Sequence, residues 1–282
     1  MIIFFEGGRL GNQIFQYCGL KKISTSETIY IYGMKSLKKT FVGIKALKTN
    51  YFFDYLIRRI GQKRFLYLSK TLGIIGFIEE RLENGEIKHI RYPGILKLIY
   101  FCDTVYFQSE KLINHSIASK LELAPSILSK AKKIIEGKPG DLSECYFIHI
   151  RRGDYATFPY PDASAMLPKE WYCKQMGLIK NYCPNPYFII VTDDVIFAAQ
   201  EFQNKPDVYI STESEAVDLG IMSLCKGGIL SASSFSWWGA YLARKNNASG
   251  IFIAPKYWWG YPLKEWLPQN IETNWINYVD AP

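Results

Sequence analysis

Short apolar segments alternate with amphipathic stretches along this chain, as expected of parallel strands connected by helices. In the first half, apolar segments at 2–5 and 28–32 predict strands, and residues 12–22 between them predict a helix. The second half is more regular, and its predicted elements are strands at 145–150, 187–192, 228–231 and 251–254 and helices at 169–181, 194–203, 214–226 and 235–245. This alternation favours an α/β fold with parallel sheets.

The length of 282 residues predicts about two domains, because a domain usually takes roughly 100–200 residues. Gly137, Pro139 and Gly140 cluster beside charged residues within 136–143, as is typical of a linker. We therefore expect an N-terminal domain over residues 1–141 and a C-terminal domain over residues 142–282.

Charge is unevenly distributed between the two halves. The chain has 34 basic and 26 acidic residues, for a net charge of +8; residues 1–141 carry 23 and 12 of them (+11), and residues 142–282 carry 11 and 14 (−3). A basic half favours an anionic partner, which could be nucleic acid, a membrane surface or a phosphorylated substrate.

Sequence signals for export and for metal binding are missing. The chain starts without the basic and long apolar regions of a secretory signal, and no segment approaches the roughly 18 apolar residues of a membrane span. The six cysteines include no C-x-x-C pair and no histidine within metal-ligand spacing, which argues against a zinc site and gives no disulfide framework. We expect a cytoplasmic protein with reduced thiols.

One basic segment is rich in aromatic residues. Residues 35–70 contain ten Lys or Arg, seven Phe or Tyr and a single acidic residue, Asp54. Such a segment can lie peripherally at an anionic membrane surface, here the inner face of the plasma membrane. It could equally be a solvated basic face over an ordinary core. Nucleic acid is a weaker interpretation, since no zinc-finger, RNP or basic-zipper pattern is present.

Glycines and an arginine follow the first predicted strand, in the segment Glu6-Gly7-Gly8-Arg9-Leu10-Gly11-Asn12-Gln13. The glycines allow the backbone to approach a ligand, while Arg9 and the start of the next helix offer positive potential. The segment is neither G-x-G-x-x-G nor a Walker A loop, and it could also be a plain turn between strand and helix.

A second polar segment, His149-Ile150-Arg151-Arg152-Gly153-Asp154-Tyr155, directly follows a predicted buried strand. Ligands of open α/β sheets bind at this end of the strands. A guanidinium can hold phosphate oxygens through two parallel hydrogen bonds, which a lysine cannot reproduce. The alternative is a strand end with ordinary surface charges.

Two further strand ends carry polar side chains. Ser233, Ser234 and Ser236 lie at the start of a predicted helix, where hydroxyl and backbone N–H groups suit a diphosphate. Asp193 and Asp194 follow another strand, where a carboxylate could accept hydrogen bonds from ribose or guanine, or simply cap the next helix. No Asp-x-Asp motif is present to bridge a metal to a nucleotide.

Three motifs together resemble the α-1,2-fucosyltransferases of glycosyltransferase family 11. They are residues 8–13, residues 149–155 and residues 233–243, in this order and spacing. More distantly, the His-x-Arg-Arg element is similar to that of α-1,6-fucosyltransferases and protein O-fucosyltransferases. The resemblance implies a two-domain GT-B fold with Rossmann-like domains facing across a cleft, GDP-β-L-fucose as donor, inversion at the anomeric carbon and no metal requirement.

By this resemblance Arg151 is the principal β-phosphate ligand and Arg152 supports it, while Asn12 would reach the diphosphate or the fucose from the first domain. His149 and one of Asp193 or Asp194 would hold the guanosine. The residues expected to contact the donor are Gly8, Arg9, Asn12, His149, Arg151, Arg152, Asp193, Asp194, Ser233, Ser234, Phe235 and Ser236.

The expected catalytic residues are Arg151, Asn12 and a carboxylate near the acceptor hydroxyl, for which Asp154 and Glu6 are candidates. Asp154 could instead orient an arginine, and GDP could depart dissociatively without a dedicated base. The expected acceptor is a galactose-containing, lipid-diphosphate-linked oligosaccharide of a bacterial surface glycan such as O-antigen. The alternatives are a GT-B enzyme with another nucleotide sugar or linkage, and a non-catalytic carbohydrate-binding protein.

Overall fold

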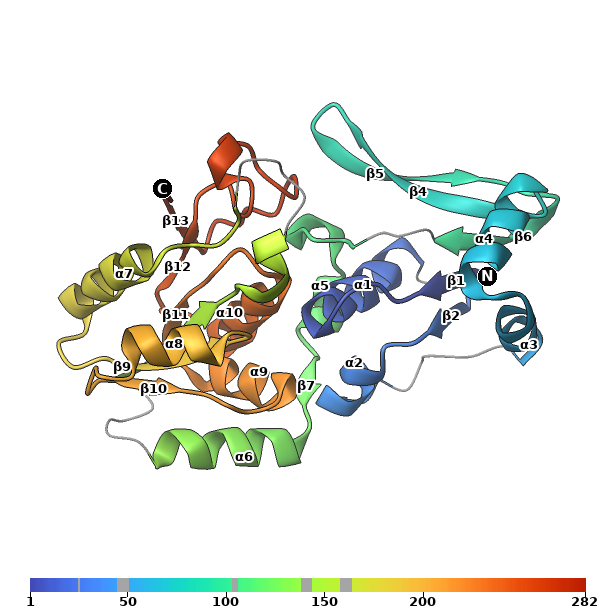
Figure 1. Cartoon of the computed structure of the whole chain (residues 1–282). Coiled ribbons are helices and arrows are strands. Elements are labelled where there is room, and N and C mark those ends of the chain that lie inside the picture. The colour runs from blue at the N-terminus through green and yellow to red at the C-terminus, as the bar shows by residue number, and fades with distance from the viewer. Residues whose placement is uncertain (25, 45–50, 103–105, 138–143, 158–163) are drawn as a thin grey trace. The chain divides into compact units, whose positions relative to one another are not determined.

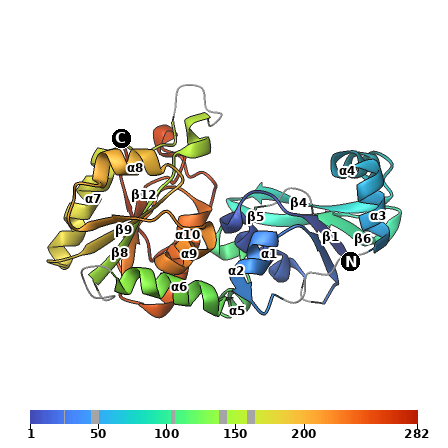
Figure 2. The ribbon, with the colours of Figure 1, turned by 60° about the horizontal axis from the view of Figure 1, so that its bottom comes forward.

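A computed structural model describes residues 1–24, 26–44, 51–102, 106–137, 144–157 and 164–282. The chain divides into two compact units (Figures 1 and 2). Unit 1 comprises residues 1–107 and 111–122, and unit 2 comprises residues 108–110 and 123–282. Each unit is built on its own sheet with helices connecting the strands, so the expected α/β architecture with parallel sheets is confirmed.

The predicted division between residues 141 and 142 lies too far along the chain. Helix α6 (Pro125–Glu136) belongs to unit 2, where it packs on helix α9 (Glu215–Leu224). Gly220 of α9 lets α6 approach closely, since a Cβ atom there would lie 3.0 Å from the Cβ of Ala131. The glycine and proline residues after Gly137 therefore follow a helix of unit 2. Residues 138–143 lie outside the described residues.

Unit 1 contains a five-stranded sheet in the order β2-β1-β6-β4-β5, parallel except for the antiparallel β4–β5 pair. Its elements are β1 (Ile2–Phe5), α1 (Leu10–Ile23), β2 (Ile29–Tyr32), α2 (Lys35–Thr40), β3 (Phe41–Val42), α3 (Tyr51–Ile60), α4 (Gln62–Thr71), β4 (Ile75–Glu83), β5 (Glu86–Tyr92), β6 (Leu96–Cys102) and α5 (His115–Ala118). The predicted strands at 2–5 and 28–32 and the helix between them are confirmed. The α3–α4 pair and the β4–β5 hairpin have no counterpart in the predicted elements.

A small apolar cluster attaches α4 to this sheet. Phe65 of α4 meets Phe101 of β6 edge to face, with ring centroids 5.5 Å apart. Ile3 of β1 and Ile75 of β4 complete the buried cluster. One face of α4 is therefore held by the sheet, and the rest of the helix faces outward.

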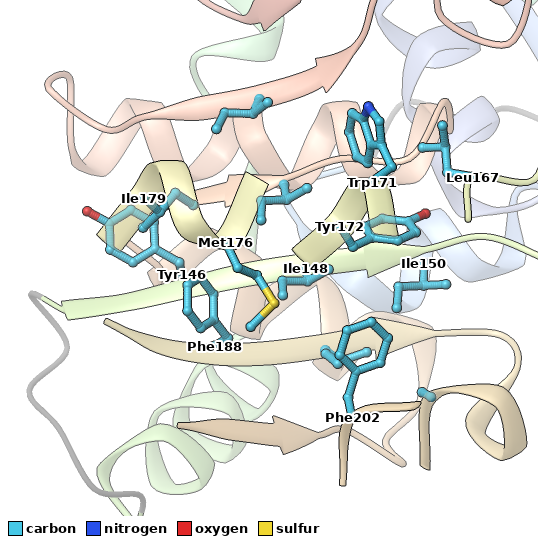
Figure 3. Close-up of a cluster of buried hydrophobic side chains, with 14 of the residues drawn as sticks. Tyr146, Ile148, Ile150, Leu167, Trp171, Tyr172, Met176, Ile179, Phe188 and Phe202 are labelled. Carbon is cyan, nitrogen blue, oxygen red and sulfur yellow. The ribbon is translucent and has the colours of Figure 1, made fainter. Parts of the chain in front are cut away.

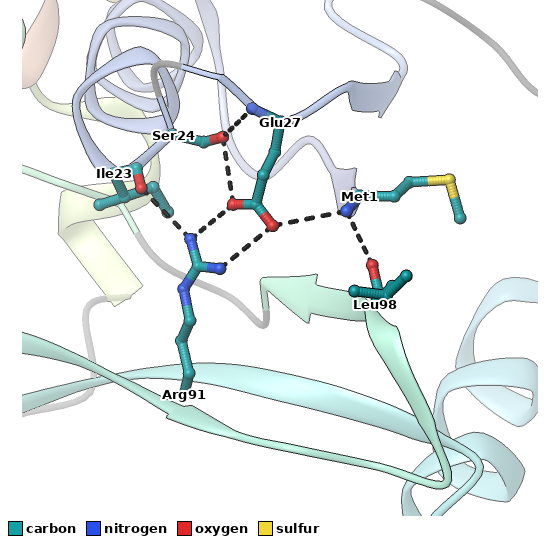
Figure 4. A network of polar contacts seen from close by, with 6 residues as sticks. All are labelled: Met1, Ile23, Ser24, Glu27, Arg91 and Leu98. Atoms are coloured by element: carbon teal, nitrogen blue, oxygen red, sulfur yellow. Dashed lines mark hydrogen bonds and ion pairs between the residues drawn. The ribbon is translucent and has the colours of Figure 1, made fainter.

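A polar network joins β5 to the end of α1 (Figure 4). The Arg91 guanidinium pairs with both carboxylate oxygens of Glu27, at 2.6 and 3.1 Å, and also donates to the carbonyl of Ile23. Hydrogen bonding from Arg91 lowers the pKa of Glu27. The Glu27 carboxylate also accepts from the Ser24 hydroxyl and the Met1 amino group. The network connects the hairpin to the rest of unit 1.

Unit 2 contains a six-stranded, all-parallel sheet in the order β10-β9-β8-β11-β12-β13. Besides α6 and α9, its elements are β8 (Cys145–Ile150), α7 (Lys169–Tyr182), β9 (Tyr187–Thr192), α8 (Val195–Phe202), β10 (Val208–Ile210), β11 (Gly227–Ile229), α10 (Ser234–Asn246), β12 (Phe252–Pro255) and β13 (Asn277–Val279); the short β7 (Glu122–Leu123) spans the division between the units. The four strands and four helices predicted here are confirmed, with boundaries shifted by at most two residues.

Alternate residues of β8 face opposite sides of the sheet, as the geometry of a strand requires. Tyr146, Ile148 and Ile150 face α7 and α8, where they form the core drawn in Figure 3. Phe147 and His149 face the other side, which carries α9 and α10 (Figure 2). All six residues of β8 are buried, as expected of a central parallel strand. The strand thus delivers the residues that follow it to a defined place.

Close packing at β11 gives a matched pair of glycine substitutions. A Cβ atom at Gly228 would overlap the Phe147 ring, whereas one at Gly177 of α7 meets nothing within 4 Å. Gly228→Ala should lower the free energy of unfolding by about 1–3 kcal/mol. Gly177→Ala should raise it by up to about 1 kcal/mol, because alanine favours a helix. Urea unfolding of both variants measures this, and equal effects would contradict the packing at β11.

Candidate active site

The polar segments of unit 2 meet at the carboxyl edge of its sheet. Strands β8 and β9 pair in register up to Ile150 and Thr192. Arg151 and Asp193 therefore leave the two strands side by side. On the other side of β8, Ser231 follows β11 and donates its backbone N–H to the β8 backbone at 3.1 Å. This edge is where open α/β sheets bind ligands.

The Arg151 guanidinium is held by two ion pairs and an aromatic ring. Its Nη2 lies 2.6 Å from Oδ1 of Asp154, and its Nη1 lies 2.9 Å from Oδ2 of Asp193. The Tyr155 ring lies 5.6 Å from the guanidinium carbon, and its hydroxyl donates to the carbonyl of Ala232 at 2.5 Å. The sequence left open whether Asp154 orients an arginine, and in the structure it contacts Arg151.

Arg152 is attached to the same pair of aspartates. Its backbone N–H donates to Oδ1 of Asp193 at 2.9 Å, and its Nε donates to Oδ2 of Asp194 at 3.2 Å. The guanidinium carbon lies 3.8 Å from the ring centroid of Phe197. Asp194 also caps α8, because its Oδ1 accepts the N–H of Phe197 at 3.0 Å. Of the two roles predicted for Asp194, the structure contains the helix cap; a guanosine contact by either aspartate stays a prediction.

Gly153 makes room for this arrangement. A Cβ atom at Gly153 would lie 2.6 Å from Oδ2 of Asp193, the oxygen that pairs with Arg151. Any larger residue would therefore displace the carboxylate that pairs with Arg151 and accepts the backbone N–H of Arg152.

The serines at the start of α10 divide into two kinds. Ser233 caps the helix by accepting the N–H of Phe235 at 3.3 Å. Ser236 is fully buried, and its hydroxyl lies 2.8 and 2.9 Å from the carbonyls of Ser231 and Ser233. Ser234 and Phe235 are only half-buried. If this helix start binds an anion, Ser234 and the first backbone N–H groups are therefore better placed to touch it than the Ser236 hydroxyl.

His149 lies beneath the site and is neutral. Its Nδ1 lies 2.6 Å from the hydroxyl of Ser231, and its ring packs on Phe235. Burial, together with the nearby positive charge of Arg151, lowers the pKa of His149 to about 3. An uncharged imidazole in this position can exchange hydrogen bonds without adding charge to the site.

The other predicted site residues belong to unit 1, where they surround the turn between β1 and α1. Gly8 has φ +76°, and a Cβ atom there would overlap the side chain of Asn12. Arg9 is exposed at the start of α1. The carboxylate of Glu6 accepts the backbone N–H of Met34. The glycine turn is thus confirmed as a structure, while the ligand contacts of these residues stay predictions.

Sequence reasoning did not select four residues that shape the site: Gly153, Tyr155, Phe197 and Ser231. Gly153 and Tyr155 belong to the motif at 149–155, so their closeness to Arg151 in the sequence could have identified them as site residues. Ser231 lies one strand away from His149, and Phe197 lies one turn into α8. Only the pairing of strands and the packing of α8 bring these two to the site.

Metal binding and membrane crossing were also considered from the sequence, and the described part of the chain bears on both. No three His, Cys, Asp or Glu side chains in it are grouped so that they could hold a metal ion. Metal independence stays a prediction. Within the same residues, no helix has the length and apolar character needed to cross a bilayer.

Comparison with known proteins gives the family. The family model described as glycosyl transferase family 11 matches residues 77–279, which is more than half of the chain. This chain belongs to glycosyl transferase family 11. Among curated proteins, it is 28% identical over 305 residues to the O-antigen biosynthesis glycosyltransferase WbnK of Escherichia coli, with 96% of this chain and 98% of WbnK covered.

Two further similarities concern sugar linkage and fold. An α-1,2-colitosyltransferase of Escherichia coli is 34% identical to this family 11 chain over 117 residues, which are 39% of this chain and 40% of that enzyme. A crystal structure of POFUT1 in complex with GDP superposes with a TM-score of 0.56 at 13% identity, covering 90% of this chain and 96% of that one. The fold is therefore of the GT-B-like type found in fucosyltransferases.

The buried His149 predicts a pH-dependent stability. Since its pKa is about 3 in the folded protein and near 6.5 when unfolded, its contribution to stability is complete above pH 6.5 and decreases as the pH falls toward 3. Between pH 7 and pH 5 this amounts to on the order of 2 kcal/mol. His149→Asn, which keeps a polar atom near Ser231, should remove that decrease, as measured by urea unfolding. His115→Asn, at an exposed position, is the control; parallel curves for the wild type and His149→Asn would contradict the assignment.

Proposed function

We propose that this family 11 protein transfers L-fucose from GDP-β-L-fucose, with inversion, to the 2-hydroxyl of a β-galactosyl acceptor in a bacterial surface glycan. The observation that carries the proposal is the guanidinium of Arg151, held by Asp154 and Asp193 at the strand edge where nucleotides bind. Similarity to WbnK and to the galactoside 2-alpha-L-fucosyltransferase Sec1 of Mus musculus (20% identical, 83% of this chain and 62% of that one) supports the reaction class.

Arg151 would stabilise the leaving GDP. As the bond between fucose and phosphate breaks, negative charge develops on the β-phosphate, and fixed donors lower the barrier by binding it. A guanidinium has five N–H donors, so its two ion pairs do not exhaust it. Since its orientation is set before the donor arrives, little reorganisation is needed when the charge appears. Arg152 and the N–H groups at the start of α10 would add further donors.

Asp154 and Asp193 would then have different roles. The side chain of Asp154 is 55% exposed and that of Asp193 only 20%. Phosphate binding to Arg151 would therefore displace Asp154 and leave Asp193 in place. A displaced Asp154 could accept the proton of the acceptor hydroxyl, and we assign it as the general base in preference to Glu6, whose carboxylate is bonded to the Met34 backbone.

A second donor is suggested by the 34% identity to the α-1,2-colitosyltransferase. Phosphate recognition by Arg151 would be the same for any nucleotide diphosphate sugar. Assays should therefore offer both a fucosyl and a colitosyl donor. Transfer from the colitosyl donor alone would change the sugar while leaving the phosphate site intact.

The function is tested by GDP release from GDP-fucose in the presence of β-galactosyl acceptors and EDTA. We expect wild-type turnover under these conditions and a fall in kcat/KM of about 100- to 1000-fold in Arg151→Lys, because a point charge replaces a two-pronged donor. Arg244→Lys is the matched control, because Arg244 also lies over an aromatic ring, that of Trp275, but is not one of the predicted site residues. Full activity of Arg151→Lys, or no GDP release and no GDP binding by the wild type, would overturn the proposal.

A further inference from the structure

Helix α3 presents aromatic side chains to solvent. Tyr51, Phe52 and Tyr55 are 90%, 65% and 62% exposed, and Arg59, one helical turn beyond Tyr55, is exposed as well. Residues spaced by three or four lie on one face of a helix, so these four side chains share a face. A solvent-facing helix surface normally carries polar residues. This surface therefore differs from an ordinary solvated basic face.

Helix α4 adds positive charge next to it. Lys63 and Arg64 are exposed, as is Tyr67 one turn later, while Phe65 on the opposite side packs into the sheet. Helices α3 and α4 follow one another through Gly61 (Figure 2). Between residues 35 and 74 the sequence contains one acidic residue, Asp54. The two helices thus combine exposed aromatic rings with a strong excess of positive charge.

The apolar character continues beyond the end of α4. Leu72 is largely exposed, and the following turn hydrogen-bonds to the start of β6: the N–H groups of Ile95 and Leu96 donate to the carbonyls of Gly73 and Ile74, both at 2.8 Å. Ile95 is 74% exposed. Exposed apolar side chains therefore continue from the end of α4 to the start of β6.

We propose that this α3–α4 surface, made of Tyr51, Phe52, Tyr55, Arg59, Lys63, Arg64, Tyr67, Leu72 and Ile95, docks on a bilayer containing anionic lipids. Cationic side chains are attracted to anionic headgroups, and aromatic rings favour the boundary between headgroups and acyl chains. Positive charge alone or exposed aromatic rings alone would not identify a lipid surface. Their combination on consecutive helices matches both the anionic headgroups and the boundary between headgroups and acyl chains. The proposal does not depend on the donor sugar, because it concerns unit 1 alone.

Vesicle sedimentation without donor or acceptor tests the proposal. The wild type should bind vesicles of equal parts phosphatidylglycerol and phosphatidylcholine at low salt, and should not bind phosphatidylcholine alone. Lys63→Glu/Arg64→Glu should weaken binding by more than about tenfold. Lys120→Glu/Lys174→Glu, at exposed positions outside the surface, is the matched control. Each of these substitutions changes the net charge by −2, so the net charge of both double variants falls from +8 to +4.

A further variant and a measurement on the wild type separate docking from misfolding and from general charge attraction. Tyr51→Ser/Phe52→Ser/Tyr55→Ser should also weaken binding while keeping the wild-type circular dichroism. Hydrogen exchange of the wild type should slow in residues 51–72 when vesicles are added. The proposal is overturned if the wild type ignores anionic vesicles, if both charge-reversal pairs lose binding equally, if exchange in 51–72 is unchanged, or if the surface binds duplex DNA more tightly than vesicles.

Discussion

The candidate site depends on one interaction, the ion pair between Arg151 and Asp193. An isolated arginine at a strand end would sample many orientations, and fixing it only when the donor binds would cost conformational entropy. Asp193 removes that freedom beforehand and also binds the backbone N–H of Arg152. One partly buried carboxylate thereby fixes the Arg151 guanidinium and the Arg152 backbone, while Asp194 holds the Arg152 side chain. Under the proposed function, this arrangement would let a unit with a net negative charge bind a diphosphate.

The pair is in turn a product of the sheet. Arg151 and Asp193 each follow a strand by one residue, and β8 and β9 end level with one another. A shift of the pairing by one residue would separate the two side chains and turn one of them to the other face. The core packed on β8 and the absence of a Cβ atom at Gly153 both maintain this register and contact. The same strand, β8, therefore contributes to the hydrophobic core of unit 2 and positions the arginines of the candidate site.

The strands and helices of unit 2 were predictable because its buried parallel strands form short apolar runs bounded by turn residues. The motif at 149–155 likewise indicated Arg151 and Arg152. The partners of these arginines were not predictable from local sequence, since Asp193 and Phe197 are more than forty residues away and reach them only through strand order and helix packing. In unit 1, α3 and α4 escaped prediction because their exposed faces are aromatic, which obscures the usual helical alternation. The division between units was misplaced because a glycine-rich turn marks a loop whether or not a domain ends there.

The central claim, that Asp193 orients Arg151 toward the β-phosphate, is tested most directly by calorimetric affinities for GDP and GMP. The wild type should prefer GDP, which has the additional phosphate. Asp193→Asn should lose most of this preference with little change in the affinity for GMP, whereas Asp154→Asn should keep the preference and lose turnover. An unchanged preference for GDP in Asp193→Asn would contradict the account, and so would an equal loss of affinity for both nucleotides, which would instead make Asp193 a guanosine ligand.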